Sequence, residues 1–461
     1  MLARIAARKR EEVRARERAR PADVLRTGLV RSGRDLEAAL RAPHAGYVLE
    51  CKRASPSAGA LVTREAYDPA GIAAIYAPFA DAVSVLTDEV DFGGSYADLA
   101  AVRRAIDLPI LAKDVVVAPY QVLEARAAGA DAVLLMLSVL DDAAYAACHA
   151  VAMEWGMHVV CEVHDELELA RATRLGARIV GINNRDLTTL AIDLATTEAL
   201  APRVAPGVVV IGESGIAGRA DALRLRDHTD ALLVGSHLSR APSVAHAVRE
   251  LVFGRAKVCG LAREEDAVAA WEAGATWGGF VLAEGSPRRV SIERAREIAR
   301  AAPLWWVAVA TDTPVERLAA LAADVPLAAV QLAGPGARAR AAALRANGLA
   351  GGCEVWVTQS VVRAAELEDE PHADRVVLDT RKDGLDGGTG ARFDWSGLEG
   401  DPRRERVVLA GGIDGSCAAR AVATGCWALD ASSRLESAPG VKDRAKLRAL
   451  FAALRGRGRA T

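Results

Sequence analysis

The sequence contains few cysteines, and no two of them stand close together. None occurs in a CxxC spacing, so the chain carries neither a disulfide framework nor a zinc signature. An odd, scattered set of thiols is typical of a reducing compartment. We therefore expect a cytoplasmic protein without a metal. The cysteines are residues 51, 148, 161, 259, 353, 417 and 426.

Long apolar runs, a charge excess and aromatic residues are also scarce. The stretch VLLMLSVL is far shorter than the ~18 residues that cross a bilayer, and the N-terminus has no signal-peptide core. A formal net charge of -2 and 4% aromatic residues argue against a nucleic-acid or acidic-membrane surface. We expect no nucleic acid and no membrane as partners, and a monomer that acts on small molecules.

The arginine-rich start, ARIAARKREEVRARERAR, has the composition of a transit peptide except for its three glutamates. Because these glutamates interrupt the positive charge, the segment is better explained as a solvated helix with a thin apolar face.

Short apolar runs alternate with amphipathic Ala/Leu/Arg-rich segments along the whole chain. Alternating strands and helices predict parallel pairing, and runs that are apolar on both faces predict a buried parallel sheet. The predicted strands of the first half are 47–53, 81–88, 109–115, 131–140, 158–165, 178–186, 208–214 and 231–238. Those of the second half are 256–261, 278–284, 305–310, 327–334, 353–359, 375–381, 406–413 and 428–433.

Two sets of eight strands predict an α/β protein with two consecutive (β/α)8 TIM barrels, over residues 1–254 and 255–461. A doubly wound open sheet is the alternative, although eight plus eight is an awkward count for it.

Polar residues stand at the ends of the predicted strands of the first half, where barrel enzymes carry their catalytic groups. Two lysines and three carboxylates gathered at one rim would shift one another's pKa, as acid–base chemistry requires. A single charge at a strand end is ordinary, whereas five strands that share the feature indicate a site. These residues are Glu50, Lys52, Lys113, Glu162, Asn183, Arg185, Glu213 and Ser214.

Glycine-rich turns follow the seventh and eighth strands of the first half. Gly212, Gly215, Gly235 and Ser236 would leave backbone N–H groups open near a helix start, as in the phosphate site of a barrel. Tight turns that need a positive φ are the alternative. We favour phosphate.

The second half has its own candidates. Cys259 ends the first strand, Arg288 follows the second and Asp379 ends the sixth. An isolated cysteine usually packs as a small apolar side chain, so Cys259 alone does not decide its role. A second phosphate site is expected after the last two strands, and residues 385–390 (LDGGTG) form a candidate lid. The phosphate candidates are Gly411, Gly412, Ser432 and Ser433.

With these residues in hand, the first half resembles indole-3-glycerol-phosphate synthases and the second resembles phosphoribosylanthranilate isomerases. Such halves are fused in the bifunctional enzymes of tryptophan biosynthesis. The first-half motifs are ECKRASPS, LAKDV, LLMLSVL, CEVH, GINNRDL and GESGI. The second-half motifs are KVCGL, GSPRRV, VVLDT, GGTGARFDW, LAGGI and PGVKD.

For the second half, the resemblance implies an Amadori isomerisation of N-(5'-phosphoribosyl)anthranilate to 1-(2-carboxyphenylamino)-1-deoxyribulose 5-phosphate. Asp379 would be the acid that opens the furanose ring, and Cys259 the thiolate base that removes the C2' proton. Arg288 would contact the substrate's carboxylate or phosphate.

For the first half, the resemblance implies closure of that product to indole-3-glycerol phosphate, with loss of CO₂ and water. Lys113 would be the general acid on the ketone oxygen, and Glu162 a base or a stabiliser of the cationic intermediate. Glu50 and Lys52 would share the dehydration, with Lys52 also within reach of phosphate or carboxylate. The positioning and binding residues would be Ser55, Asn183, Arg185, Glu213 and Ser214. No metal or redox cofactor is implied.

Two positions depart from the family pattern. Val115 stands where many synthases have phenylalanine, and Ala333 replaces the histidine usual in the isomerase's Gln-Leu-His-Gly. Two other hypotheses remain open at this point. In the first hypothesis, only the first barrel is active and the second barrel is structural. In the second hypothesis, both barrels bind phosphosugars without catalysing a reaction.

Overall fold

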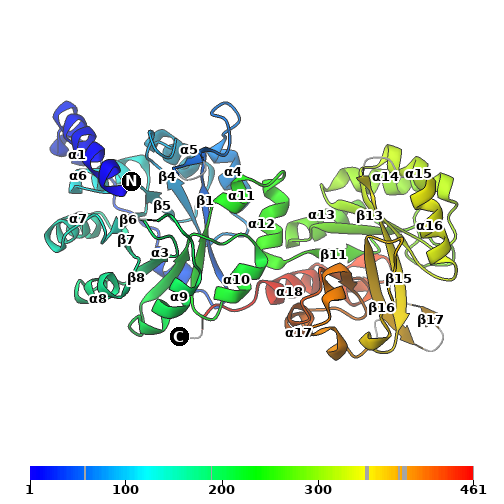
Figure 1. Cartoon of the computed structure of the whole chain (residues 1–461). Helices are drawn as coiled ribbons and strands as arrows, with labels where there is room; N and C mark the ends of the chain where they lie inside the picture. The colour runs from blue at the N-terminus through cyan, green and yellow to red at the C-terminus, as the bar shows by residue number, and fades with distance from the viewer. Residues whose placement is uncertain (57–58, 188, 348–351, 383–384, 387–391, 460–461) are drawn as a thin grey trace. The chain divides into compact units, whose positions relative to one another are not determined.

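The computed structural model describes residues 1–56, 59–187, 189–347, 352–382, 385–386 and 392–459 (Figure 1). The chain divides into two compact units. One comprises Met1–Val252 with Arg457–Thr461, and the other Phe253–Gly456.

Eight parallel strands close into a barrel in the first unit, in the order β1-β10-β9-β8-β7-β6-β5-β4 (Figure 1). Each predicted run overlaps one of these strands, so the barrel prediction is confirmed. Their residues are buried on both faces apart from the ends of β5 and β7, as a parallel sheet covered by helices requires. The strands are β1 Gly46–Cys51, β4 Ala82–Leu86, β5 Ile110–Lys113, β6 Ala132–Met136, β7 His158–Val163, β8 Ile179–Asn183, β9 Val209–Glu213 and β10 Ala231–Val234.

Helices surround this barrel, and several begin at a residue whose side chain caps them. Ser95, Asp141 and Asp165 accept backbone N–H groups at the starts of α5, α7 and α8. The helices are α1 Leu2–Ala19, α2 Ala22–Arg26, α3 Leu36–Leu40, α4 Pro69–Tyr76, α5 Tyr96–Ala105, α6 Pro119–Ala128, α7 Asp142–Glu154, α8 Glu166–Arg174, α9 Ala195–Leu200, α10 Arg219–Leu225, α11 Ser236–Ser239 and α12 Val244–Phe253.

The arginine-rich start forms α1, as predicted, with Ile5, Ala6 and Val13 buried. Lys9 is buried with them, which the sequence pattern did not indicate.

The second unit is also a closed parallel barrel, because β19 pairs with β11 and β15 pairs with β16. The prediction of a second barrel is therefore also confirmed. The strands are β11 Ala256–Cys259, β12 Trp277–Val281, β13 Trp305–Ala310, β14 Leu327–Leu332, β15 Glu354–Val361, β16 Arg375–Lys382, β18 Val407–Leu409 and β19 Ala428–Ala431. The helices are α13 Glu264–Ala273, α14 Ile292–Ala301, α15 Val315–Asp324, α16 Ala337–Asn347, α17 Ala418–Ala423 and α18 Arg444–Arg455.

The strand–helix alternation is incomplete between β15 and β16. Their connection, residues 362–374, is fully described and contains only the 3-10 helix Ala364–Glu366. The longer helix that the repeating pattern predicts is therefore absent from this connection.

Four tryptophans form a cluster in the second barrel. The ring centroid of Trp277 lies 5.1 Å from that of Trp305, 5.2 Å from Trp356 and 5.5 Å from Trp427. Trp356 is fully buried, and the cluster packs against strand valines such as Val377. Large rings therefore fill much of this barrel's interior.

In the described part of the chain, no helix combines the length and apolar character that crossing a membrane requires.

Candidate active sites

A cavity of about 540 Å³ lies at the carboxyl ends of the strands of the first barrel. Parallel strands bring their carboxyl ends to one rim, so polar residues from distant parts of the sequence meet there. The residues singled out from the sequence of the first half line this cavity, except Gly212, which lies within β9, and Glu213, which is fully buried. The lining residues among them are Glu50, Lys52, Ser55, Lys113, Glu162, Asn183, Arg185, Ser214, Gly215, Gly235 and Ser236.

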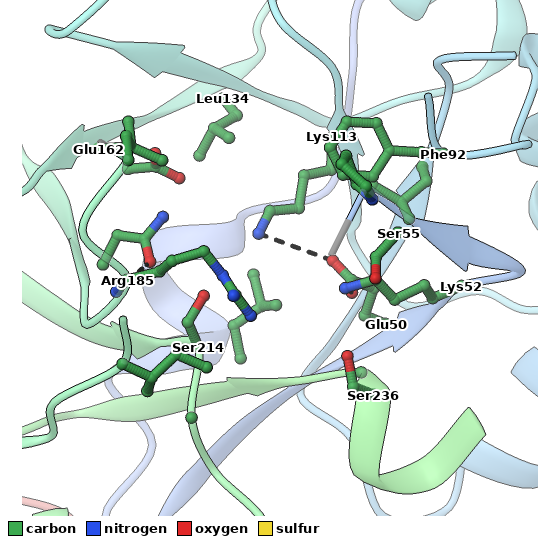
Figure 2. A pocket seen from close by; sticks show the side chains of 18 of the residues that line it. Glu50, Lys52, Ser55, Phe92, Lys113, Leu134, Glu162, Arg185, Ser214 and Ser236 are labelled. Carbon is green, nitrogen blue, oxygen red and sulfur yellow. Dashed lines mark hydrogen bonds and ion pairs between the residues drawn. The ribbon is translucent and has the colours of Figure 1, made fainter. Parts of the chain in front are cut away.

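Lys113, the last residue of β5, contacts two carboxylates, and Figure 2 shows its ammonium directed toward Glu50. Its Nζ lies 2.9 Å from Glu213 Oε2 and 3.6 Å from Glu50 Oε2. Burial alone would lower the pKa of Lys113, but the carboxylates of Glu213, Glu50 and Glu162 raise it above its ordinary value. Lys113 is therefore an ammonium throughout the neutral range.

Glu50 and Lys52 contact each other, as their spacing predicts. Lys52 Nζ lies 3.0 Å from Glu50 Oε1, although Lys52 stands just beyond β1, which ends at Cys51. Burial would raise the pKa of Glu50, but Lys52 and Lys113 lower it overall. Glu50 is thus a carboxylate, and a Cβ at Gly235 would lie 2.2 Å from its Oε1. A larger residue at position 235 would therefore force the Glu50 side chain to move.

Glu213 has a different environment. Its Oε2 accepts from Lys113, whereas its Oε1 has no hydrogen-bond partner within the described residues. Burial raises the pKa of Glu213 to about 7, and Lys113 opposes that rise only in part. Gly181 on β8 approaches the same carboxyl so closely that a Cβ there would lie 2.2 Å from Oε1.

Glu162, near the end of β7, faces a histidine that the sequence analysis did not select. His164 Nε2 lies 3.3 Å from Glu162 Oε1, and His164 Nδ1 lies 3.0 Å from Glu168 Oε2. Burial would lower the pKa of His164, but the two carboxylates raise it to about 10. Burial would also raise the pKa of Glu162, yet His164 and Lys113 lower it overall. The pair is therefore an imidazolium beside a carboxylate.

The turns after β9 and β10 line the same cavity. The φ angles of Ser214 and Gly215 are 65° and 85°. Ser214, which is not a glycine, therefore adopts the left-handed backbone conformation. Such strain is common where a backbone is shaped for a ligand. Gly212 is not part of the turn, because it lies within β9, and its hydrogen faces the side chain of Leu232.

In the second barrel, Cys259 ends β11 beside a buried lysine. A Cβ on Gly279 would lie 2.9 Å from Cys259 Sγ and 3.0 Å from Lys257 Cε, so the two side chains are neighbours. Lys257 Nζ lies 2.6 Å from Asp430 Oδ2 and donates to Gln331 Oε1 at 3.0 Å. Burial raises the pKa of the Cys259 thiol, and Lys257 partly offsets that rise.

Arg288 lies close to this thiol. A Cβ on Gly260 would lie 2.6 Å from Arg288 Cδ and 3.2 Å from Ser432 Oγ, and Ser432 Oγ donates to the Cys259 carbonyl at 3.0 Å. Two nitrogens of Arg288 donate to Glu436, at 2.9 Å and 2.8 Å. Glu436 therefore fixes the guanidinium near Cys259. Ser433 begins the next 3-10 helix.

The sequence analysis placed Asp379 at the end of the sixth strand, and this position is wrong. Strand β16 continues beyond Asp379 to Lys382. The extension pairs with β15 and with β17 Leu385–Asp386, whereas the neighbouring β18 ends at Leu409, the register partner of Leu378. Asp379 thus stands just past the end of β18.

Gly411 follows β18 beside Asp379. A Cβ on Gly411 (φ 83) would lie 3.4 Å from Asp379 Oδ1 and 2.3 Å from Thr380 Oγ1. The Gly412 carbonyl accepts from Arg392 Nε at 2.9 Å. Of the predicted lid, residues 387–390 lie outside the described residues.

Comparison with known proteins assigns each barrel. The family model of Indole-3-glycerol phosphate synthase matches residues 2–251, and that of N-(5'phosphoribosyl)anthranilate (PRA) isomerase matches residues 256–453. Tryptophan biosynthesis protein TrpCF of Salmonella typhi is 43% identical over 455 residues, which are 99% of each chain. The chain belongs to this bifunctional family. It is an enzyme of tryptophan biosynthesis with a synthase barrel and an isomerase barrel.

One further relative matches nearly the whole chain, and a solved structure matches the second half. Tryptophan biosynthesis protein TrpCF of Yersinia pestis is 42% identical over 443 residues, 96% of this chain and 92% of that protein. The crystal structure of phosphoribosyl anthranilate isomerase from Thermus Thermophilus is 35% identical, covers 43% of this chain and 98% of that chain, and gives a TM-score of 0.38.

The synthase cavity also contains residues that sequence reasoning missed. Phe92 supplies an aromatic ring beside Lys113, in a cavity where Val115 stands in place of the phenylalanine of many synthases (Figure 2). Its signal was an aromatic ring soon after the second strand, in a chain with few aromatics. Arg240 lines the cavity near Ser236. Ile5 also reaches it from α1, which no sequence pattern connects with the barrel rim.

Proposed function

We propose that Lys113 is the general acid of the synthase barrel. The observation that carries this role is the position of its ammonium in the cavity, between Glu213 and Glu50. As the aromatic carbon attacks the substrate's ketone, a C–C bond forms and the ketone oxygen takes a proton from Lys113. The carboxylate then leaves as CO₂, and its electron pair restores the aromatic ring.

Dehydration follows, and the Glu50–Lys52 pair is placed to assist it. The new hydroxyl leaves as water when Lys52 supplies a proton, and Glu50 accepts the proton lost from the ring CH2 carbon next to nitrogen, so that the carbon–carbon double bond of the indole forms. The contact of 3.0 Å between the two side chains supports such a transfer. Glu162 lies across the cavity from Glu50 and Lys52 (Figure 2) and stabilises the cationic intermediate from there.

The substrate's phosphate would bind at the turns after β9 and β10. Ser214, Gly215, Gly235 and Ser236 all line the cavity, and Ser214 retains a strained φ of 65 there. Arg185 lines the same cavity and supplies positive charge. Asn183, Ser55 and Glu213 position the substrate and the ammonium.

In the isomerase barrel, Asp379 would protonate the furanose oxygen and so open the ring to a Schiff base. The Cys259 thiolate then removes the C2' proton, and the resulting enol becomes the ketone. The neighbouring ammonium of Lys257 favours this thiolate. Arg288 binds the carboxylate or the phosphate of the substrate, and Gly411, Gly412, Ser432 and Ser433 bind the phosphate.

The two halves are tested together by supplying N-(5'-phosphoribosyl)anthranilate and following each product by chromatography. Cys259→Ala should lower the isomerase step about 10³-fold while still converting added carboxyphenylamino intermediate. Lys113→Ala should accumulate that intermediate. Each variant retains the other activity, which serves as its folding control. Loss of both steps in both variants would contradict two independent sites.

We also propose functional domains over residues 1–254 and 255–461, and a cytoplasmic monomer that takes small phosphorylated substrates. Seven free cysteines support a reducing compartment. Light scattering should give a mass near 48.4 kDa, and twice that mass would contradict the monomer.

A further inference from the structure

We propose that His164 is a positioning residue of the synthase reaction, which orients the Glu162 carboxylate toward the substrate and is itself held by Glu168. This inference rests on the role of Glu162 proposed above.

Two contacts from one carboxylate fix the histidine. His164 directly follows the end of β7, and Glu168 lies in the first turn of α8. Glu168 Oε2 accepts from the His164 backbone N–H at 2.9 Å and lies 3.0 Å from ring Nδ1. The main chain and the ring are therefore held by the same group, and Nε2 is directed away from Glu168.

The remaining ring nitrogen faces the cavity residue. Nε2 lies 3.3 Å from Glu162 Oε1, and Glu162 lines the cavity. Both atoms are buried, and neither has a hydrogen bond within the described residues. The ion pair is thus the contact that compensates their burial, because a buried charge without a partner is costly.

The charge of His164 helps to keep Glu162 ionised among its buried neighbours. Glu162 faces Lys113 from β5 and Asn183 from β8, and its charge also acts on the carboxyl of Glu213 from β9. Lys113 also pairs with Glu213 and Glu50. His164 lies two residues after Glu162, just past the end of β7, and pairs with Glu162 and Glu168. Without the imidazolium, the pKa of Glu162 should rise, because its burial would be less compensated.

The decisive variant is His164→Gln, which keeps a polar group and removes the charge. We expect kcat on added carboxyphenylamino intermediate to fall about 10-fold with little change in KM. The acid limb of kcat/KM should move to higher pH by about 1 unit, because more Glu162 is then protonated. Glu168→Gln should show a smaller shift in the same direction.

His158→Gln is the matched control. His158 begins the same strand β7, and its Nε2 lies 3.2 Å from Asp35 Oδ1, far from the cavity end of the strand. It should leave the pH profile unchanged. The isomerase step, measured in every variant, reports folding.

A wild-type acid limb in His164→Gln would overturn the inference if Glu162→Gln is inactive. Full synthase activity in Glu162→Gln would instead overturn the proposed role of Glu162, so the two failures are distinguishable.

Discussion

Charge states in the synthase cavity are set by which neighbour each buried group has. Lys113 and Glu50 stabilise each other's charged form, and burial does not overcome that pairing. Glu213 shares the same ammonium, but its Oε1 has no hydrogen bond among the described residues, and its pKa is raised to about 7. One carboxyl of the cluster therefore titrates near neutrality while its neighbours do not.

Glu213→Gln should flatten the pH dependence of stability. Between the ordinary value of 4.5 and about 7, the folded protein retains a proton on Glu213 that the unfolded chain has released. The free energy of unfolding of the wild type therefore decreases as pH rises through this window, and that of the variant should not. Denaturant unfolding from pH 5 to pH 8 measures the difference. An equal pH slope for both proteins would contradict the raised pKa.

At the scale of elements, helix α1 both lines the synthase cavity and forms ion pairs with the barrel next to it. Ile5 from this helix lines the cavity. Lys9 Nζ lies 2.9 Å from Asp88 Oδ2 and 2.7 Å from Asp114 Oδ1, and Asp114 directly follows Lys113. Arg8 also contacts Asp88, at 2.7 Å. These buried ion pairs attach the helix to the barrel beside Lys113, the proposed general acid.

Lys9→Met should release this helix. Removal of one partner from a buried ion pair costs about 3–5 kcal/mol, since Asp88 and Asp114 would stay buried with less compensation. We expect a lower midpoint of denaturation, a higher KM for the synthase step and faster proteolysis within α1. Arg14→Met, on an exposed position of the same helix, is the control. Equal proteolysis of both variants would show that the Lys9 contacts do not attach the helix.

At the scale of the whole molecule, each barrel has its own core and its own site. The synthase barrel is filled by aliphatic strand residues such as Leu111 and Val160, whereas Trp277 and Trp356 fill the isomerase barrel. Each set of site residues comes from one unit, so neither proposed reaction needs a side chain of the other barrel.

Trp356→Ala should therefore destabilise the isomerase barrel alone. The lost burial and the cavity left behind should cost about 3–5 kcal/mol. At intermediate denaturant we expect the isomerase step to disappear first while added carboxyphenylamino intermediate is still converted. Leu111→Ala is the reciprocal variant and should weaken the synthase step first. Loss of both activities at one denaturant concentration in both variants would contradict separate cores.

The local sequence was enough to predict the strands and most of the polar residues at the barrel rims. Runs that are apolar on both faces have few folds open to them other than a covered parallel sheet, and parallel strands bring their carboxyl ends together. Lys113, Glu162 and Cys259 could thus be selected before any contact was known. Asp379 was selected as well, although β16 continues beyond it.

Only the tertiary structure decided how these groups are paired and charged. His164 is held by Glu168 of the following helix, Lys9 pairs with carboxylates from other segments, and Arg288 is held by Glu436. Such contacts join residues through space, and a pKa depends on burial and on the distance to each charge. Neither quantity is contained in the local pattern of the chain.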